Sequence, residues 1–98
     1  TRLDAETLQT YYGKGKRDFA LHDLNSLSLP KVNLSEAVFH QANLSKINLQ
    51  GATLCNTDFG RANLNRANLR DANLVKAYFS NSDLEGADLR GADLSYAY

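Results

Sequence analysis

The side chains best suited to chemistry are two histidines, one cysteine and a column of Asn and Asp residues. His22 and His40 are the only histidines, and neither has a Cys or His partner at the short spacing of zinc ligands. Cys55 is the only cysteine, so no internal disulfide can form, and it lacks the paired histidine of a cysteine nucleophile. We expect Cys55 to be an ordinary surface thiol, and we predict no catalytic residue and no metal site.

The Asn and Asp residues recur at intervals of five, a regularity that would suit a ladder of bound cations. Each five-residue unit supplies only one such side chain, however, and it is often a neutral Asn. The Ca²⁺-binding nonapeptide pattern and the EF-hand loop are both absent. We therefore interpret these residues as structural. Their side chains bond to nearby backbone and tolerate unusual φ/ψ angles, which suits corners of the chain.

A repeat of five residues, running from Phe19 to Leu94, positions these polar side chains. Stepping by five from Phe19 meets Leu or Phe at all sixteen positions, which we term the centres. The residue two before a centre is small or apolar at most positions, and the residue immediately before it is Asn or Asp in twelve units. The two residues after a centre vary and are mostly polar. The repeating unit is therefore Ala-(Asn/Asp)-Leu-X-X.

A period of five fits neither an α-helix nor a flat strand. Along a helix the centres would scatter around the axis, and along a strand they would alternate between the two faces. A chain that turns a corner every five residues keeps every centre inside, and four corners close a turn of 20 residues. The phenylalanines support that length, because they occur at every twentieth position: Phe19, Phe39, Phe59 and Phe79. The sequence thus predicts about four stacked, four-sided coils with the phenylalanines in one vertical column.

The segment from Phe39 to Leu94 resembles the pentapeptide-repeat family, whose motif is A-(D/N)-L-X-X. The N-terminal segment followed by Gly-Lys-Arg-Asp-Phe, residues 15–19, resembles the short cyanobacterial members, such as those of Nostoc. The resemblance covers about residues 17–98 and implies an all-β solenoid, a right-handed quadrilateral β-helix. It also implies little about function, because most members have no assigned role. A minority inhibit DNA gyrase by resembling B-form DNA in shape and charge.

Residues 1–15 do not repeat, and we expect them to form a short capping α-helix and a connector ahead of the β-helix at residues 16–98. Asp4 suits the N-cap position of such a helix. Its apolar face would be formed by Ala5, Leu8, Tyr11 and Tyr12. A helix placed over the first coil would shield the backbone edge and the apolar cross-section that a solenoid leaves open.

Composition and shape argue against catalysis and against direct nucleic-acid binding. The chain has 11 basic and 11 acidic residues, so its formal net charge is zero rather than strongly positive. A coil filled with Leu and Ala is expected to lack a cleft as large as the roughly 300 Å³ of small-molecule sites. Residues 13–16, Gly-Lys-Gly-Lys, do not have P-loop spacing. We therefore predict no cofactor, no small-molecule substrate and no enzymatic activity.

Two function hypotheses follow. The preferred one is a non-catalytic structural or protein-interaction module, and the alternative is a DNA-mimic inhibitor of DNA gyrase or topoisomerase. A DNA mimic needs a sustained anionic surface, whereas residues 17–98 hold eight Lys and Arg against nine Asp and Glu. The single cysteine suits a reducing compartment, and no apolar run approaches the ~18 residues of a membrane span. We expect a cytoplasmic protein without membrane contact.

The last coil carries the candidate interaction surface. The sequence stops in register, with Ala97 and Tyr98 beginning another unit and no polar cap after them, although soluble solenoids usually need one. We expect this coil to bind a protein partner or a second copy, or to be continued by further repeats in a longer natural protein. Acidic residues outnumber bases on its rim. The surface, which we term the terminal-coil surface, consists of Tyr78, Leu84, Leu89, Leu94, Tyr96 and Tyr98.

Overall fold

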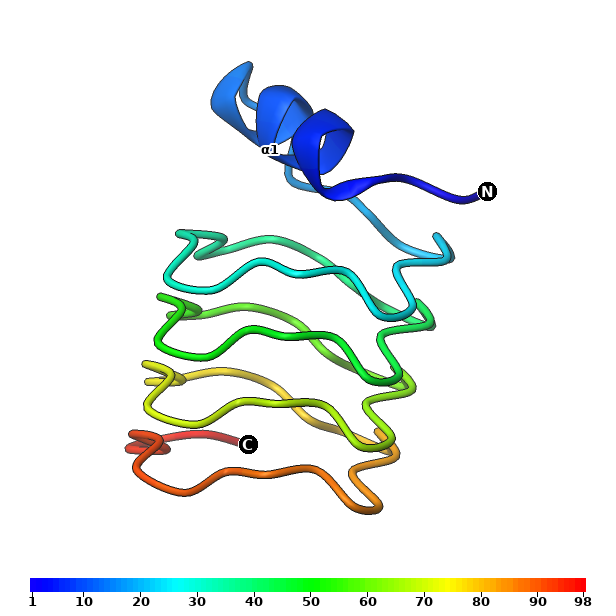
Figure 1. The fold of residues 1–98 in the computed structure, drawn as a ribbon. Helices are drawn as coiled ribbons and strands as arrows, with labels where there is room; N and C mark the ends of the chain where they lie inside the picture. Colours follow the sequence, from blue (N-terminus) through cyan, green and yellow to red (C-terminus); the bar gives the residue numbers. More distant parts are fainter.

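The computed structural model describes residues 1–98 as one short helix, α1 (Ala5–Gly13), above a stack of coils (Figure 1). Each coil is joined to the next by isolated parallel bridges between residues twenty apart, such as Asp18 with Val38 and Asn73 with Asp93. One bridged residue occurs in every five, and two-residue turns separate the bridges, so no longer strand forms. This register matches the predicted turn of 20 residues, and the predicted N-terminal helix is confirmed.

The centres fill the interior of the stack. Phe19, Phe39 and Phe59 are almost completely buried, and successive ring centroids in the phenylalanine column are 5.9, 5.7 and 5.3 Å apart. The alanines two before the centres are buried beside them from Ala37 to Ala77, which allows opposite walls to approach. The predicted vertical column of phenylalanines is therefore confirmed.

The corners lie after the centres and not at the Asn and Asp column. The carbonyl of a centre accepts a hydrogen bond from the N–H three residues later, as in Ala42 to Phe39 at 2.9 Å. The residue two after each centre has a φ between 56° and 75°, and thirteen of these sixteen residues are not glycine. The third position of such a turn is where type II turns require positive φ. The interpretation of the Asn and Asp residues as the corners with unusual φ/ψ is wrong.

The Asn and Asp side chains instead brace the turns from the bridged position before them. All twelve accept, through Oδ1, a hydrogen bond from the N–H two residues later, at 2.8–3.2 Å. This is the bond of an Asx turn. The predicted bond to nearby backbone is therefore present in every unit that carries Asn or Asp.

Helix α1 is held over the first coil by a few specific contacts. Asp4 is the N-cap, as predicted, and accepts a hydrogen bond from the Thr7 N–H at 2.7 Å. Leu8 is fully buried, and the Tyr12 hydroxyl donates to the Ser35 carbonyl at 2.8 Å. Tyr11 was expected on the same apolar face but is exposed, because the face that meets the coil is centred on Leu8 and Tyr12, four residues apart.

Candidate functional site

The terminal-coil surface lies at the end of the stack opposite α1 (Figure 1). Its leucines occupy the same columns as fully buried leucines of earlier coils, but no coil covers them. Leu94 is 42% exposed, whereas Leu74, one coil above it, is 0% exposed. Leu84 and Leu89 are partly buried against the core. The structure therefore presents the last layer of the apolar core at this end.

The backbone edge at the same end is also unpaired. In the coil above, the N–H groups of Leu64, Leu69 and Leu74 each donate to a carbonyl of the last coil at 2.8 Å. The corresponding N–H groups of the last coil have no acceptor within the chain; they belong to Leu84, Leu89 and Leu94. An unpaired edge beside exposed apolar side chains is the usual template for adding another chain segment.

Two of the three tyrosines of the surface pack on each other. The rings of Tyr78 and Tyr98 are stacked, with centroids 4.8 Å apart and planes 6° apart. The Phe79 N–H donates to the Tyr98 carbonyl, and the Tyr98 N–H donates to the Ala77 carbonyl, both at 2.9 Å. Tyr98 thus lies against Tyr78 and forms the same two backbone bonds as the bridged residues of its column. Tyr96 lies at a corner, is 78% exposed and makes no aromatic contact.

The acidic rim of the last coil is partly neutralised. Asp88 forms an ion pair with Arg90 at 2.6 Å, and Arg70 of the coil above lies 3.7 Å from the same carboxylate. The hydrogen bonds from the Arg90 side chain, then from its backbone, lower the pKa of Asp88 to about 2. The hydrogen bond from the Ser95 hydroxyl lowers the pKa of Asp93. Asp83 and Asp93 have no basic partner, so negative charge remains at the rim.

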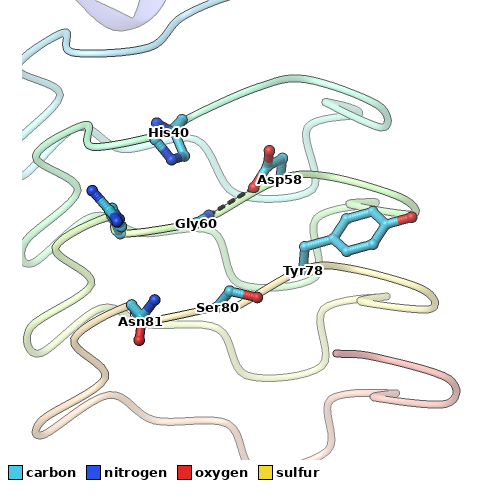
Figure 2. A pocket seen from close by; sticks show the side chains of 7 residues that line it. His40, Asp58, Gly60, Tyr78, Ser80 and Asn81 are labelled. Atoms are coloured by element: carbon cyan, nitrogen blue, oxygen red, sulfur yellow. Dashed lines mark hydrogen bonds between the residues drawn. The ribbon is translucent and has the colours of Figure 1, made fainter.

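A polar hollow of about 350 Å³ lies on the wall of the coil beside Tyr78 (Figure 2). Its floor is Gly60, where a side chain would meet the Asp58 carboxylate at 2.9 Å and the His40 ring at 3.1 Å. Asp58 Oδ1 accepts a hydrogen bond from the Gly60 N–H at 2.8 Å. The lining is completed by Arg61, Tyr78, Ser80 and Asn81.

The expectation that the coil offers no concavity of this size is therefore wrong. The hollow arises because Gly60 has no side chain, whereas His40 and Ser80 in the same outward column do. The single glycine in this outward column is the sequence signal that could have predicted the hollow. It becomes apparent only when the sequence is aligned in turns of 20 residues. A second hollow, of about 430 Å³, lies between α1 and the first coil.

The histidines and the cysteine lie apart from one another. The His22 Nδ1 is 3.2 Å from the Thr1 carbonyl at the N-terminal end. Cys55 is half-buried, and its N–H donates to the Ser35 hydroxyl at 3.1 Å. No three His, Cys, Asp or Glu side chains come close enough together to hold a metal ion.

The repeat and the register together point to a known sequence family. The profile of the family described as pentapeptide repeats matches eight copies, over residues 23–54, 33–71 and 72–98. The chain belongs to the pentapeptide-repeat family. Pentapeptide-repeat proteins fold as right-handed quadrilateral β-helices, which is the architecture that the resemblance implied. They are generally non-catalytic and often mediate protein interactions.

Solved structures of cyanobacterial pentapeptide-repeat proteins resemble this chain. HetL from Nostoc sp. strain PCC 7120, which is involved in heterocyst differentiation regulation, is 29% identical with a TM-score of 0.57; the match covers 97% of this chain and 46% of HetL. The protein alr5209 from Nostoc PCC 7120 is 33% identical with a TM-score of 0.52, over 88% of this chain and 75% of alr5209. This pentapeptide-repeat chain therefore spans about half the length of HetL.

A more distant structural match is QnrB1, a plasmid-mediated fluoroquinolone resistance protein. It is 18% identical with a TM-score of 0.29, over 82% of this chain and 47% of QnrB1. A sequence search of curated proteins gave no match. The only helix of this pentapeptide-repeat chain, α1, is too short and too polar to cross a membrane.

Proposed function

We propose that this pentapeptide-repeat chain is a non-catalytic protein-interaction module that associates through the terminal-coil surface. The observation that supports it is the change in burial along one column, from fully buried Leu74 to 42% exposed Leu94. Covering that layer would remove apolar surface from water, and each fully buried Leu contributes about 1.5–3 kcal/mol relative to an exposed one.

Either a following repeat segment or a second copy of the chain would cover this layer, and the occupant we favour is a second copy joined end to end about a two-fold axis. Head-to-tail stacking would require the terminal coil of one copy to meet the first coil of the next, where α1 stands in the way (Figure 1). Two terminal coils meet without that obstacle, and a two-fold contact brings identical faces together. The stacked pair of Tyr78 and Tyr98 would then face the same pair, or its neighbours, in the partner copy.

The two-fold contact also brings like charges together. Asp83 and Asp93 have no basic partner, whereas Asp88 is paired with Arg90 and Arg70. Repulsion between the acidic rims would weaken association at low salt, and screening would strengthen it at higher salt, where the Debye length falls to about 8 Å near 0.15 M.

Sedimentation velocity at several protein and salt concentrations tests the proposal. We expect a monomer–dimer equilibrium that shifts toward dimer as salt rises, and Leu94→Asp should abolish the dimer. Leu21→Asp is the matched control, because Leu21 is an exposed leucine at the opposite end and its φ of 66° accommodates Asp. A monomer at every concentration, with Leu94→Asp unchanged in behaviour, would overturn the proposal.

A DNA supercoiling assay distinguishes the gyrase-inhibitor hypothesis from the interaction-module proposal. Eight basic and nine acidic residues in residues 17–98 do not form the sustained anionic surface of a DNA mimic. We therefore expect DNA supercoiling by gyrase to continue unchanged when the protein is present at the concentration of the enzyme. Inhibition at that ratio would favour the alternative.

A further inference from the structure

The N-terminal cap covers only part of the first coil. Residues 1–3 lie along one face of it as an extra strand, with Arg2 in a parallel bridge with Asp23. The Asp23 N–H donates to the Thr1 carbonyl at 2.9 Å, and the Leu3 N–H donates to the Asp23 carbonyl at 3.3 Å. At the adjacent corner the Arg2 guanidinium donates to the Asn25 carbonyl at 2.7 Å. These bonds replace those that a preceding coil would make.

The backbone around Pro30 has no such cover. The N–H groups of Ser28 and Asn33 have no acceptor, and the carbonyls of Ser28, Pro30 and Asn33 have no donor. One coil below, all five equivalent groups are bonded to the first coil at 2.8–2.9 Å. They are the N–H groups of Asn48 and Thr53 and the carbonyls of Asn48, Gln50 and Thr53. The first coil therefore keeps an open edge across two faces and the corner between them, which we term the Pro30 edge.

Space for another chain segment exists beside this edge. The hollow of about 430 Å³ opens between α1 and the face that contains Asn33. Helix α1 contributes Gln9, Tyr12 and Gly13 to its lining, and the first coil contributes Lys31, Val32, Asn33 and Leu34. The apolar part of its lining is formed by Tyr12, Val32 and Leu34. The ammonium group of Lys31 forms no ion pair with any carboxylate of the chain.

We propose that the Pro30 edge binds an extended segment of a partner polypeptide by β-strand addition. The segment would run parallel to the first coil, as residues 1–3 do on the neighbouring face, and would bond to Ser28 and Asn33. Leu3 packs against the core from that neighbouring strand, so the bound segment would place an apolar side chain in the hollow. An acidic residue beside it would meet Lys31. Main-chain bonds supply affinity in this mode of recognition, and side-chain pockets supply specificity.

The test uses a synthetic peptide with the sequence of residues 66–75, because this segment of the chain occupies the same faces two coils below the Pro30 edge. A scrambled peptide of the same composition is the control. Amide hydrogen exchange of the intact protein is followed by NMR at peptide concentrations up to about 1 mM, where weak complexes of about −4 kcal/mol are half formed. We expect exchange at Ser28 and Asn33 to slow about twofold when the complex is half formed, with Asp23 unchanged because its N–H is already bonded. Perturbation confined to the terminal coil, or none at all, would overturn the proposal.

A pair of variants isolates the backbone contribution. Asn33→Pro removes the N–H that the segment needs, while the Leu34 N–H keeps its bond to the Thr53 carbonyl at 2.9 Å. Asn33→Ala loses the same side chain but keeps the N–H. We expect Asn33→Pro to weaken peptide binding about twofold to tenfold relative to Asn33→Ala, the range of one net hydrogen bond. Equal affinities in the two variants would refute strand addition, and the exchange experiment on the unmodified chain decides the matter if the proline variant does not fold.

Discussion

Removing the ring of Phe59 tests how the interior holds the coils together. Phe59 is fully buried, and its ring lies 5.7 Å from Phe39 and 5.3 Å from Phe79, so Phe59→Ala deletes two stacking contacts. Phe-to-Ala changes in cores cost about 3–5 kcal/mol, and each aromatic pair adds about 0.5–1.5 kcal/mol beyond burial. Domains have a free energy of unfolding of about 5–15 kcal/mol. We therefore expect Phe59→Ala to remove about a quarter or more of the stability.

The same substitution at the end of the phenylalanine column, Phe79→Ala, provides a comparison with Phe59→Ala. Phe79 is only partly buried and has one ring neighbour, Phe59, so Phe79→Ala should cost clearly less. Phe59→Leu is the matched control, because Leu occupies the centres of the other three faces. It keeps an apolar side chain at the centre and should cost about 1–3 kcal/mol, the value of the two stacking contacts that it loses.

The measurement is urea unfolding followed by circular dichroism, with the midpoint and slope fitted for each variant. The expected order of destabilisation is Phe59→Ala, then Phe79→Ala, then Phe59→Leu. If Phe79→Ala were as costly as Phe59→Ala, stacking between successive coils would not be what stabilises the phenylalanine column.

Three further changes address the core, the corners and the rim. Leu49→Arg should abolish folding, detected as loss of the cooperative unfolding transition, because Leu49 is fully buried and an unpaired charge there is very costly. Lys76→Val should destabilise by about 1–3 kcal/mol in urea unfolding, since φ is 61° at this corner and β-branched residues strain there, whereas Lys76→Asn should be near neutral. Asp88 has a folded pKa of about 2 against an ordinary 3.8, so its stabilising contribution is complete above pH 4 and is lost as pH falls toward 2. Asp88→Asn should remove the loss of stability between about pH 4 and pH 2 that Asp88 causes. If the free energy of unfolding of the variant falls with pH as steeply as that of the unmodified chain, the ion pair with Arg90 contributes nothing.

Some features of the sequence could be interpreted locally, and these predictions succeeded. The leucine and phenylalanine period implied an inward column, and the spacing of Phe19, Phe39, Phe59 and Phe79 indicated a 20-residue turn that the bridges reproduce. Asp4 was recognisable as an N-cap because capping depends on the next three residues alone. Each of these signals recurs along the chain or operates within one turn, so no knowledge of distant contacts was needed.

Other features were decided by how coils lie on one another. Positive φ falls at the variable corner residue, where outward side chains such as Lys31 and Glu36 carry no common sequence signal. The hollow at Gly60 exists because His40 and Ser80 lie directly above and below it, and the Pro30 edge exists because the cap reaches only part of the first coil. The repeat by itself determined that the chain coils and which side chains face inward, because burial of the Leu or Phe and of the small residue two before it in each unit dictates both. Only the tertiary structure decided where backbone groups stay unpaired, because that depends on which segment happens to lie over each face.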